Sequence, residues 1–303
     1  MKFEIMLENK YKFQTVGQAL RNISEIFKNK GIINSERETE ILLSYFLKMN
    51  RSDIYLNGDR KLKNIEKLQL EDMIKKRLKK IPLQYITKHQ EFMGMDFLVG
   101  KGVLIPRPET EILVEEVIKK LKNYKYSDNI GVADLGTGSG VIAISIAKFI
   151  NNITVYATDI SKKSLQIALK NAQKHSCENK IIFLYGDLFE PFKNKIEKFS
   201  LEAIISNPPY IDSCNFESLP PEVRDNEPKT ALFGGTDGID YYRKILKKSP
   251  QYLKRNGFLA LEVGVNQSKI VKELLIGENN FNQEIEIIKD YLGIERVVIA
   301  YRK

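Results

Sequence analysis

The feature that most constrains this chain is a regular alternation of strand-like and helix-like segments that begins at about residue 128. The runs "IGVADLG", "ITVYATD", "IIFLYGD", "LEAIISN" and "GFLALEVG" have the short, apolar character of buried strands. Longer segments with helical spacing, such as "SGVIAISIAKFI" and "SKKSLQIALKNAQKH", separate most of them, whereas the last two strand-like runs, "QEIEIIKDY" and "ERVVIAYR", follow one another without a helix. This order predicts an α/β fold with a doubly wound, mostly parallel sheet and an antiparallel last strand.

Two further segments precede this alternation. Residues 1–83 have the apolar spacing of helices, and Ser35 followed three places later by Glu38 predicts a capping box at the start of one of them. Residues 84–105 contain short apolar runs around Gly94 and Gly100, which predict a β-hairpin. We therefore expect a small helical bundle over 1–83, a hairpin linker over 84–105 and an α/β domain over 106–303.

Composition and charge narrow the class of protein. No apolar run is long enough to span a bilayer, and the charged N-terminus lacks the apolar core of a signal peptide, so we expect a cytoplasmic protein with no membrane segment. The two cysteines, Cys177 and Cys214, fit no metal-ligand spacing, and the only histidines are His89 and His175, so we expect no metal. Residues 1–80 contain 18 Lys and Arg and 11 Asp and Glu, which supplies +7 of the net charge of +9. Such a segment suits an acidic or RNA partner or a solvated helix surface, and the even spread of its lysines favours the solvated surface.

The first candidate site is the glycine-rich turn in "VADLGTGSG", between a predicted strand and a predicted helix. Its glycines are spaced G-x-G-x-G, and not G-x-G-x-x-G as is typical of dinucleotide binding. Glycines let the backbone approach a ligand closely, and the N–H groups at the start of the helix can bind a carboxylate. The pattern alone would fit a plain tight turn equally well. The expected cofactor-binding residues of this turn are Gly136, Thr137, Gly138, Ser139 and Gly140.

Acidic residues follow at the ends of the next two strands. Asp159 ends the second strand, 23 residues after Gly136, where a carboxylate can accept hydrogen bonds from two ribose hydroxyls. After the third strand, Asp187 could accept from an exocyclic amino group while Leu188 covers the ring of an adenine. Each acid alone is more often a cap or a turn residue, but three successive strand ends with suitable groups indicate a ligand with a carboxylate, a ribose and an adenine. S-adenosylmethionine has these three parts.

The fourth strand ends in "SNPPY", at the edge where open α/β sheets bind ligands. The side-chain carbonyl of Asn207 and the backbone carbonyl of Pro208 could accept both N–H groups of a planar amino group and aim its nitrogen at a methyl donor. Pro208 and Pro209 stiffen the turn, and Tyr210 could pack its ring on the planar group. We therefore expect Asn207, Pro208, Pro209 and Tyr210 to be the catalytic and substrate-binding residues of a direct methyl transfer, with Asn207 also touching the cofactor.

These motifs resemble a known family. "DLGTGSG", the "TD" at 158–159, "GDLFEP" and "NPPYI" resemble the class I S-adenosylmethionine-dependent methyltransferases, whose Rossmann-like catalytic domain would occupy 106–303. "PLQYI", "VLIPRPETE", "EPKTALFGGTDGIDYYRKI" and "LEVG" narrow the resemblance to the HemK/PrmC family, the peptide chain release factor glutamine methyltransferases, over nearly the whole chain. The resemblance implies methyl transfer from S-adenosylmethionine to the side-chain amide nitrogen of the glutamine in the Gly-Gly-Gln loop of release factors. It also implies that the bundle over 1–83 docks the release factor, and that adenine stacking is weaker at Leu188, where some relatives have a tryptophan.

Two other functions are compatible with the residues. An adenine amino-group methyltransferase acting on DNA or rRNA would use the same "NPPY" geometry, because adenine also presents a planar amino group. Only about 30 residues separate Tyr210 from the next predicted helix, too few for the target-recognition domain that such enzymes usually carry, so we expect no direct nucleic-acid substrate. A nucleoside-binding module without catalysis is the other possibility, and the intact Asn207–Tyr210 set argues against it.

Overall fold

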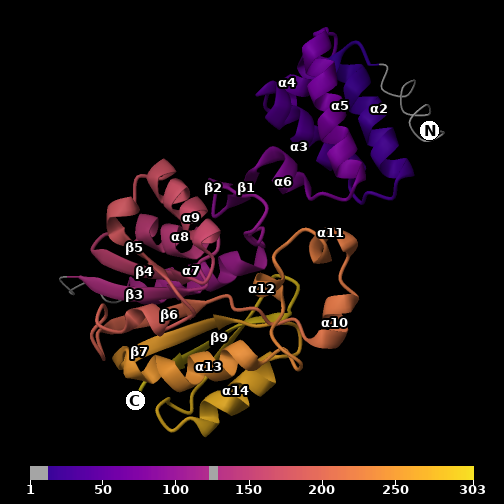
Figure 1. Cartoon of the computed structure of the whole chain (residues 1–303). Helices are drawn as coiled ribbons and strands as arrows, with labels where there is room; N and C mark the ends of the chain where they lie inside the picture. The colour runs from indigo at the N-terminus through magenta and orange to yellow at the C-terminus, as the bar shows by residue number, and fades with distance from the viewer. Residues whose placement is uncertain (1–12, 123–128) are drawn as a thin grey trace. The chain divides into compact units, whose positions relative to one another are not determined.

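The computed structural model describes residues 13–122 and 129–303 and divides into two compact units, Met1–Lys88 and His89–Lys303 (Figure 1). The first twelve residues of the expected 1–83 segment, and residues 123–128 of the expected 106–303 segment, lie outside the described residues. Each unit has its own hydrophobic core. In the described parts of the chain, no helix combines the length and the apolarity needed to cross a membrane.

The first unit is helical. Within residues 13–88, its helices are α2 Val16–Asn29, α3 Ser35–Leu47, α4 Arg51–Leu56, α5 Asn64–Leu78 and α6 Leu83–Thr87. Apolar side chains at helical spacing on these elements, among them Phe27, Leu43 and Ile74, form its core. The predicted capping box at Ser35 is wrong, because the Glu38 carboxylate instead pairs with the buried Arg77 guanidinium, with an Nε–Oε2 distance of 2.5 Å.

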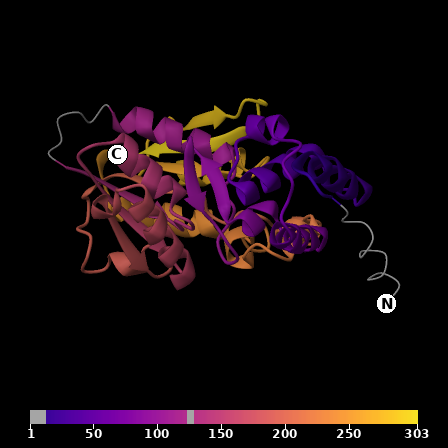
Figure 2. The same cartoon turned by 90° about the horizontal axis from the view of Figure 1, so that it is seen from above.

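The second unit is built on a seven-stranded sheet. The strands of this unit are β1 His89–Phe92, β2 Met95–Leu98, β3 Ile130–Leu135, β4 Ile153–Asp159, β5 Ile181–Tyr185, β6 Leu201–Ser206, β7 Leu253–Glu262, β8 Glu286–Lys289 and β9 Glu295–Tyr301. Strands β1 and β2 form a separate two-stranded sheet, and β3 to β9 form the large sheet. The strand order of the large sheet is β5-β4-β3-β6-β7-β9-β8. Strands β3 to β7 run parallel, and β9 pairs antiparallel with both β7 and β8, which confirms the predicted mixed sheet. Figure 2 shows the yellow C-terminal strands and the rose strands β4 and β5 on opposite sides of this unit.

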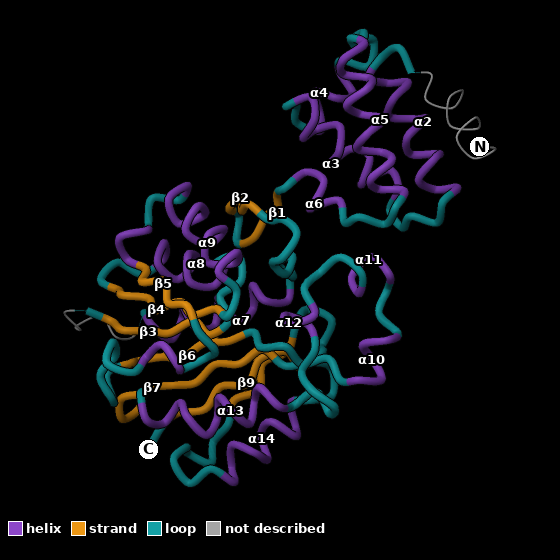
Figure 3. The backbone as a smooth tube through the Cα atoms, in the orientation of Figure 1, coloured by secondary structure: helices purple, strands orange, loops and turns teal. Residues whose placement is uncertain are grey.

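Helices cover both faces of the large sheet. The helices of this unit are α7 Glu109–Leu121, α8 Val141–Phe149, α9 Lys162–Lys174, α10 Ser213–Glu217, α11 Pro221–Arg224, α12 Lys229–Leu232, α13 Asp240–Lys248 and α14 Ser268–Gly277. In Figures 1 and 3, α8 and α9 lie above the sheet and α13 and α14 below it. Successive side chains of a strand point to opposite faces of the sheet, so each face has its own hydrophobic core. Val132 of β3 belongs to the same core as Ile142 of α8, whereas Leu135 belongs to the same core as Tyr242 of α13.

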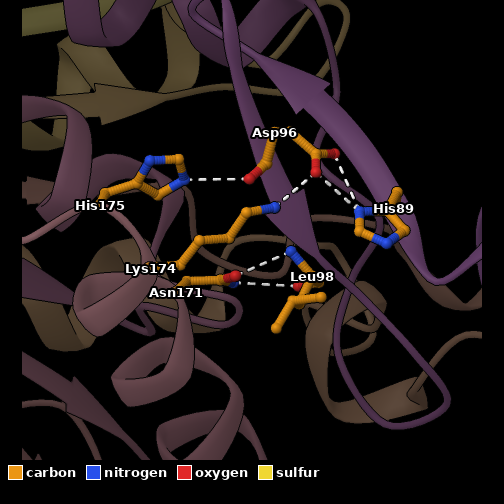
Figure 4. A network of polar contacts seen from close by, with 6 residues as sticks. All are labelled: His89, Asp96, Leu98, Asn171, Lys174 and His175. Carbon is orange, nitrogen blue, oxygen red and sulfur yellow. Dashed lines mark hydrogen bonds and ion pairs between the residues drawn. The ribbon is translucent and has the colours of Figure 1, made fainter.

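The hairpin of β1 and β2 is fastened to α9 by polar side chains (Figure 4). The Asn171 side chain accepts from the Leu98 backbone N–H at 2.7 Å and donates to the Leu98 carbonyl at 3.0 Å. The Asp96 carboxylate pairs with Lys174 at 2.5 Å and with His89 at 2.8 Å. Residues 84–87, which we expected in the hairpin, belong instead to helix α6 of the first unit.

Candidate active site

The candidate site lies where four neighbouring strands end together. Leu135, Thr158, Ser206 and Leu261 are paired across β4, β3, β6 and β7. The next residue of each segment therefore stands at the same edge of the sheet: Gly136, Asp159, Asn207 and Glu262. A cavity of about 300 Å³ opens at this edge. Its lining includes these predicted site residues: Gly136, Thr137, Gly138, Ser139, Asp159, Asp187, Leu188, Asn207, Pro208 and Pro209.

The glycine-rich turn connects β3 to α8 and borders the cavity. Gly136 and Gly138 have φ values of +75° and +57°, and a Cβ at either position would meet nothing within 4 Å, so their backbones face open space. Gly140 does not line the cavity. A Cβ there would lie 2.9 Å from Cδ1 of Ile144 and 3.0 Å from Cβ of Ala168, so this glycine is required by packing and not by direct contact with the cavity.

Asp134, one residue before the end of β3, holds the turn and the start of α8 through hydrogen bonds. Its Oδ2 accepts from the Thr137 hydroxyl at 2.6 Å and from the Ala143 backbone N–H at 3.2 Å. Its Oδ1 is buried and accepts no hydrogen bond from the described residues. Burial raises the pKa of Asp134 to about 7, against the lowering effect of the two hydrogen bonds. Asp134 was not among the predicted site residues. The available signal was an aspartate inside the apolar run "GVADLG", because a charged residue in a buried strand usually has a structural or functional partner.

Asp159 is the last residue of β4, and its carboxylate contacts the glycine-rich turn. Its Oδ2 accepts from the Gly138 backbone N–H at 2.9 Å, and its Oδ1 accepts from the Ser161 backbone N–H at 2.7 Å. Burial raises the pKa of Asp159, and the two backbone hydrogen bonds lower it. A carboxylate oxygen accepts more than one hydrogen bond, so Asp159 keeps acceptor capacity toward the cavity that it lines.

The segment after β5 brings Asp187 and Leu188 to the cavity wall. Leu188 has φ of +47°, a left-handed conformation that costs a non-glycine residue roughly 1–2 kcal/mol. Oδ2 of Asp187 lies 3.8 Å from Nζ of Lys244 on α13. Strained residues of this kind persist where the surrounding structure holds them, and they cluster at ligand-binding sites.

The Asn207 side chain is held by a buried polar chain. Its Nδ2 donates to Oγ1 of Thr110 on α7 at 3.0 Å, and Oγ1 of Thr110 donates to Oε2 of Glu262 at 2.6 Å. Thr110 and Glu262 are 2% and 1% exposed. Burial raises the pKa of Glu262 to about 7; the Thr110 hydrogen bond lowers it, Glu109 raises it and Arg296 lowers it.

Two acceptors in the Asn-Pro-Pro-Tyr turn have no donor in the part of the chain that the structure describes. Within the described residues, neither Oδ1 of Asn207 nor the backbone carbonyl of Pro208 accepts a hydrogen bond from the protein, and both residues line the cavity. Pro209 lines the cavity beside them, and the turn leaves the sheet directly after Ser206.

Tyr210 is placed differently from the expectation that its ring covers the substrate group. It does not line the cavity, and it packs against the core on the α13 and α14 face, close to Gly264. Burial raises the pKa of Tyr210 above its ordinary range. Its backbone carbonyl accepts from Nε2 of Gln267 at 2.8 Å, so Tyr210 anchors the turn to the residue that precedes α14.

A segment before α7 forms another wall. Pro106 and Arg107 line the cavity, and the buried Glu227 accepts from the Ile105 backbone N–H at 2.9 Å and from Nη2 of Arg107 at 2.5 Å. Local pattern did not predict roles for Arg107, Thr110, Glu227 or Glu262. The available signal was their position in "VLIPRPETE", "EPKTALFGG" and "LEVG", the segments that carry the family resemblance. Within residues 13–122 and 129–303, no three His, Cys, Asp or Glu side chains come together as a group that could hold a metal.

Comparisons with known proteins identify the family. A family model described as the PrmC N-terminal domain matches residues 18–87, and the Methyltransferase small domain matches residues 108–218. The chain is 36% identical over 286 residues to the release factor glutamine methyltransferase of Bacillus anthracis, covering 94% of this chain and 98% of that protein. It is 42% identical over 267 residues to the release factor glutamine methyltransferase of Clostridium acetobutylicum, covering 88% and 90%.

A solved structure supports the fold independently of close sequence similarity. The catalytic domain of hMettl16, in complex with MAT2A 3'UTR hairpin 6, has a TM-score of 0.52 and 16% identity, covering 80% of this chain and 84% of that chain. The second unit has the class I S-adenosylmethionine-dependent methyltransferase fold, as the resemblance of its motifs implied. From the identity and coverage of these relatives and from the two domain matches, the chain belongs to the family of release factor glutamine methyltransferases, which its sequence motifs predicted.

Proposed function

We propose that this chain transfers a methyl group from S-adenosylmethionine to the side-chain amide nitrogen of the glutamine in the Gly-Gly-Gln loop of peptide chain release factors. The observation that carries the proposal is the pair of carbonyl oxygens at the end of β6, Oδ1 of Asn207 and O of Pro208, which line the cavity and accept from no described donor. Relatives that are 36–42% identical carry the name of this activity.

The cavity suits S-adenosylmethionine. The Gly136–Gly138 turn has open space where side chains would stand, which lets the ligand approach the backbone closely. Asp159 would accept from the ribose hydroxyls, and Asp187 and Leu188 would contact the adenine. Thr137 and Ser139 would border the ligand, whereas Gly140 would act by allowing α8 to pack closely. When bound, the cofactor supplies a methyl group on a positively charged sulfur.

The Asn-Pro-Pro-Tyr turn would hold the substrate. A glutamine amide has two N–H donors, and Asn207 and Pro208 offer two acceptors that would hold the amide in one plane. Pro209 would keep the Pro208 carbonyl in a fixed direction, and Tyr210 would anchor the turn through its hydrogen bond from Gln267. Such positioning can lower a barrier by on the order of 7–11 kcal/mol. No buried base is needed, because the nitrogen becomes acidic as it gains the methyl group and can lose its proton to water.

The helical unit would dock the release factor. Its match to the PrmC N-terminal domain over 18–87 supports this role, as does the net charge of +7 over residues 1–80. Exposed apolar side chains such as Ile33 and Leu56, 82% and 81% exposed, would provide contact area. If charge contributes to docking, the KM for release factor should rise with ionic strength, whereas the KM for S-adenosylmethionine should change little.

The proposal is tested by incubating the purified chain with a release factor and S-adenosylmethionine labelled in its methyl group, followed by peptide mapping. We expect the label on the loop glutamine. A release factor in which glutamate replaces that glutamine is the matched control and should take up no label. Label on another residue, or on added DNA or rRNA but not on the release factor, would contradict the proposal.

A further inference from the structure

The shape of the Asn207 side chain does not determine which end of its amide faces the cavity. Its amide is planar, and a 180° rotation would exchange the nitrogen and the oxygen with almost no change in shape. Only hydrogen-bond partners therefore decide which end faces the cavity. The nearest described partner is Oγ1 of Thr110, 3.0 Å from Nδ2 of Asn207, and the Glu262 carboxylate also lies close enough to accept from the Asn207 side chain.

Which of the two side chains donates in this contact is decided by a second hydrogen bond, between Thr110 and Glu262. A threonine hydroxyl has one proton, and Oγ1 of Thr110 donates it to Oε2 of Glu262 at 2.6 Å. While the Glu262 carboxyl is ionised, the Thr110 oxygen can then only accept, so Asn207 presents its N–H group to Thr110. The Asn207 carbonyl is left for the cavity. Glu262 is placed for this role by the sheet, because it follows Leu261, which pairs with Ser206, the residue before Asn207.

The partners cannot easily adopt another arrangement. Thr110 and Glu262 are almost completely buried, so water does not offer them alternative hydrogen bonds. Glu262 is also fixed at its backbone, where its carbonyl accepts from the Tyr242 hydroxyl at 3.0 Å. If Asn207 rotated, its carbonyl would face the Thr110 oxygen, which has no proton to give. A buried pair of acceptors without a donor between them is unfavourable, because neither oxygen recovers the hydrogen bond that it would make with water.

We propose that Thr110 and Glu262 are positioning residues that hold the Asn207 carbonyl toward the cavity and thereby make the site select a carboxamide side chain over a carboxylate. The inference rests on the proposed function. A glutamine amide donates to both Asn207 and Pro208, whereas a glutamate carboxylate would face two acceptors with none of its own donors. With Asn207 free to rotate, its N–H group could instead donate to the carboxylate, and the discrimination would fall.

The test compares three threonine variants in the full-length chain. Thr110→Val keeps the shape and removes the hydroxyl, and Thr110→Ser keeps the hydroxyl. Thr158→Val is the matched control, because the buried Thr158 hydroxyl has no hydrogen-bond partner among the described residues. For each, we would measure kcat and KM on release factor, the Kd of S-adenosylmethionine, and inhibition by a release factor with glutamate in place of the loop glutamine.

We expect Thr110→Val to lower kcat by about 10–100-fold with little change in cofactor Kd, by the loss of one oriented hydrogen bond in the transition state. We also expect the glutamate-bearing release factor to inhibit Thr110→Val at least several-fold more strongly than it inhibits the wild type. Thr110→Ser should recover most of the rate and the discrimination, and Thr158→Val should match the wild type in both. A purely structural role of Thr110 would lower melting temperature and rate without changing the ratio of glutamate to glutamine binding, and that result would overturn the inference.

Glu262→Gln provides a second, independent variant if Thr110→Val does not fold. Its amide can donate to Thr110, which frees the threonine proton for a rotated Asn207, so discrimination should again fall. Unchanged discrimination in Glu262→Gln would overturn the inference, while an active wild type would leave the proposed function intact. A wild type that does not methylate the release factor would overturn the proposed function and this inference with it.

Discussion

Replacement of Gly140 by alanine should destabilise the second unit strongly, and the structure separates two reasons. Gly140 has φ of +86°, in the left-handed region, and its missing Cβ would stand 2.9 Å from Ile144 and 3.0 Å from Ala168. The left-handed conformation costs a non-glycine residue about 1–2 kcal/mol. Insertion of a carbon into a packed core typically costs about 1–3 kcal/mol more. Gly140→Ala should therefore lower the free energy of unfolding by about 2–5 kcal/mol.

Two other glycines separate the contributions. Gly293 has φ of +81°, but a Cβ there would meet nothing within 4 Å, so Gly293→Ala should show only the conformational cost of about 1–2 kcal/mol. Gly277, the last residue of α14, has neither problem, and alanine there should be neutral or stabilising by up to about 1 kcal/mol.

Urea denaturation of the full chain, followed by circular dichroism, measures all three variants without ligand. Gly140→Ala should lose more stability than Gly293→Ala, and Gly277→Ala should lose none. If Gly140→Ala were no less stable than Gly293→Ala, the close approach of α8 and α9 at this turn would not be the reason for the glycine.

Three further predictions concern the site and its supports. Asn207→Ala should lower kcat on release factor by about 10²–10³-fold, because one of the two oriented acceptors is lost, while the Kd of S-adenosylmethionine measured by calorimetry stays within a few-fold; retained turnover would contradict the role of Asn207. The raised pKa of Asp134, about 7, means that the folded state holds the proton more tightly than the unfolded state, so this group's stabilising contribution is complete below about pH 4 and is lost as pH rises through about 7. Urea midpoints should accordingly fall less between pH 5 and pH 8 in Asp134→Asn than in the wild type, and an equal fall would refute this assignment. Tyr242→Phe should cost about 1–3 kcal/mol of stability in thermal or urea unfolding, because the buried Glu262 carbonyl loses the donor that lies 3.0 Å away; a variant as stable as the wild type would show that the carbonyl finds another donor.

The sequence predicted the fold well because the fold depends on short-range pattern. Short apolar runs, separated by helical segments, mark the strands, and the lack of a helix before residue 295 marks the antiparallel end of the sheet. The positions of Gly136, Asp159 and Asn207 followed from the same reasoning, because each comes directly after or at the end of a predicted strand and parallel strands end at one edge.

What the sequence did not predict depends on contacts between distant segments. Glu38 was expected to cap its own helix, but Arg77, 39 residues away, takes its carboxylate. The ring of Tyr210 packs on the hydrophobic core between the sheet and helices α13 and α14. Gly264, which has no side chain and lies 54 residues further along the chain, leaves room for this ring. The role of Thr110 and Glu262 depends on the hydrogen bond between them. These residues are 152 positions apart, so no local sequence pattern could predict that they are in contact.

That separation has a consequence for how the protein is made. Asn207 is translated long after Thr110, and Glu262 emerges later still, as the last residue of β7. Until β7 has joined the sheet, the threonine proton has no carboxylate to receive it, so either end of the asparagine can face outward. A nascent or truncated chain that stops short of β7 lacks Glu262. Its substrate end acquires a defined polarity only when nearly the entire polypeptide is present.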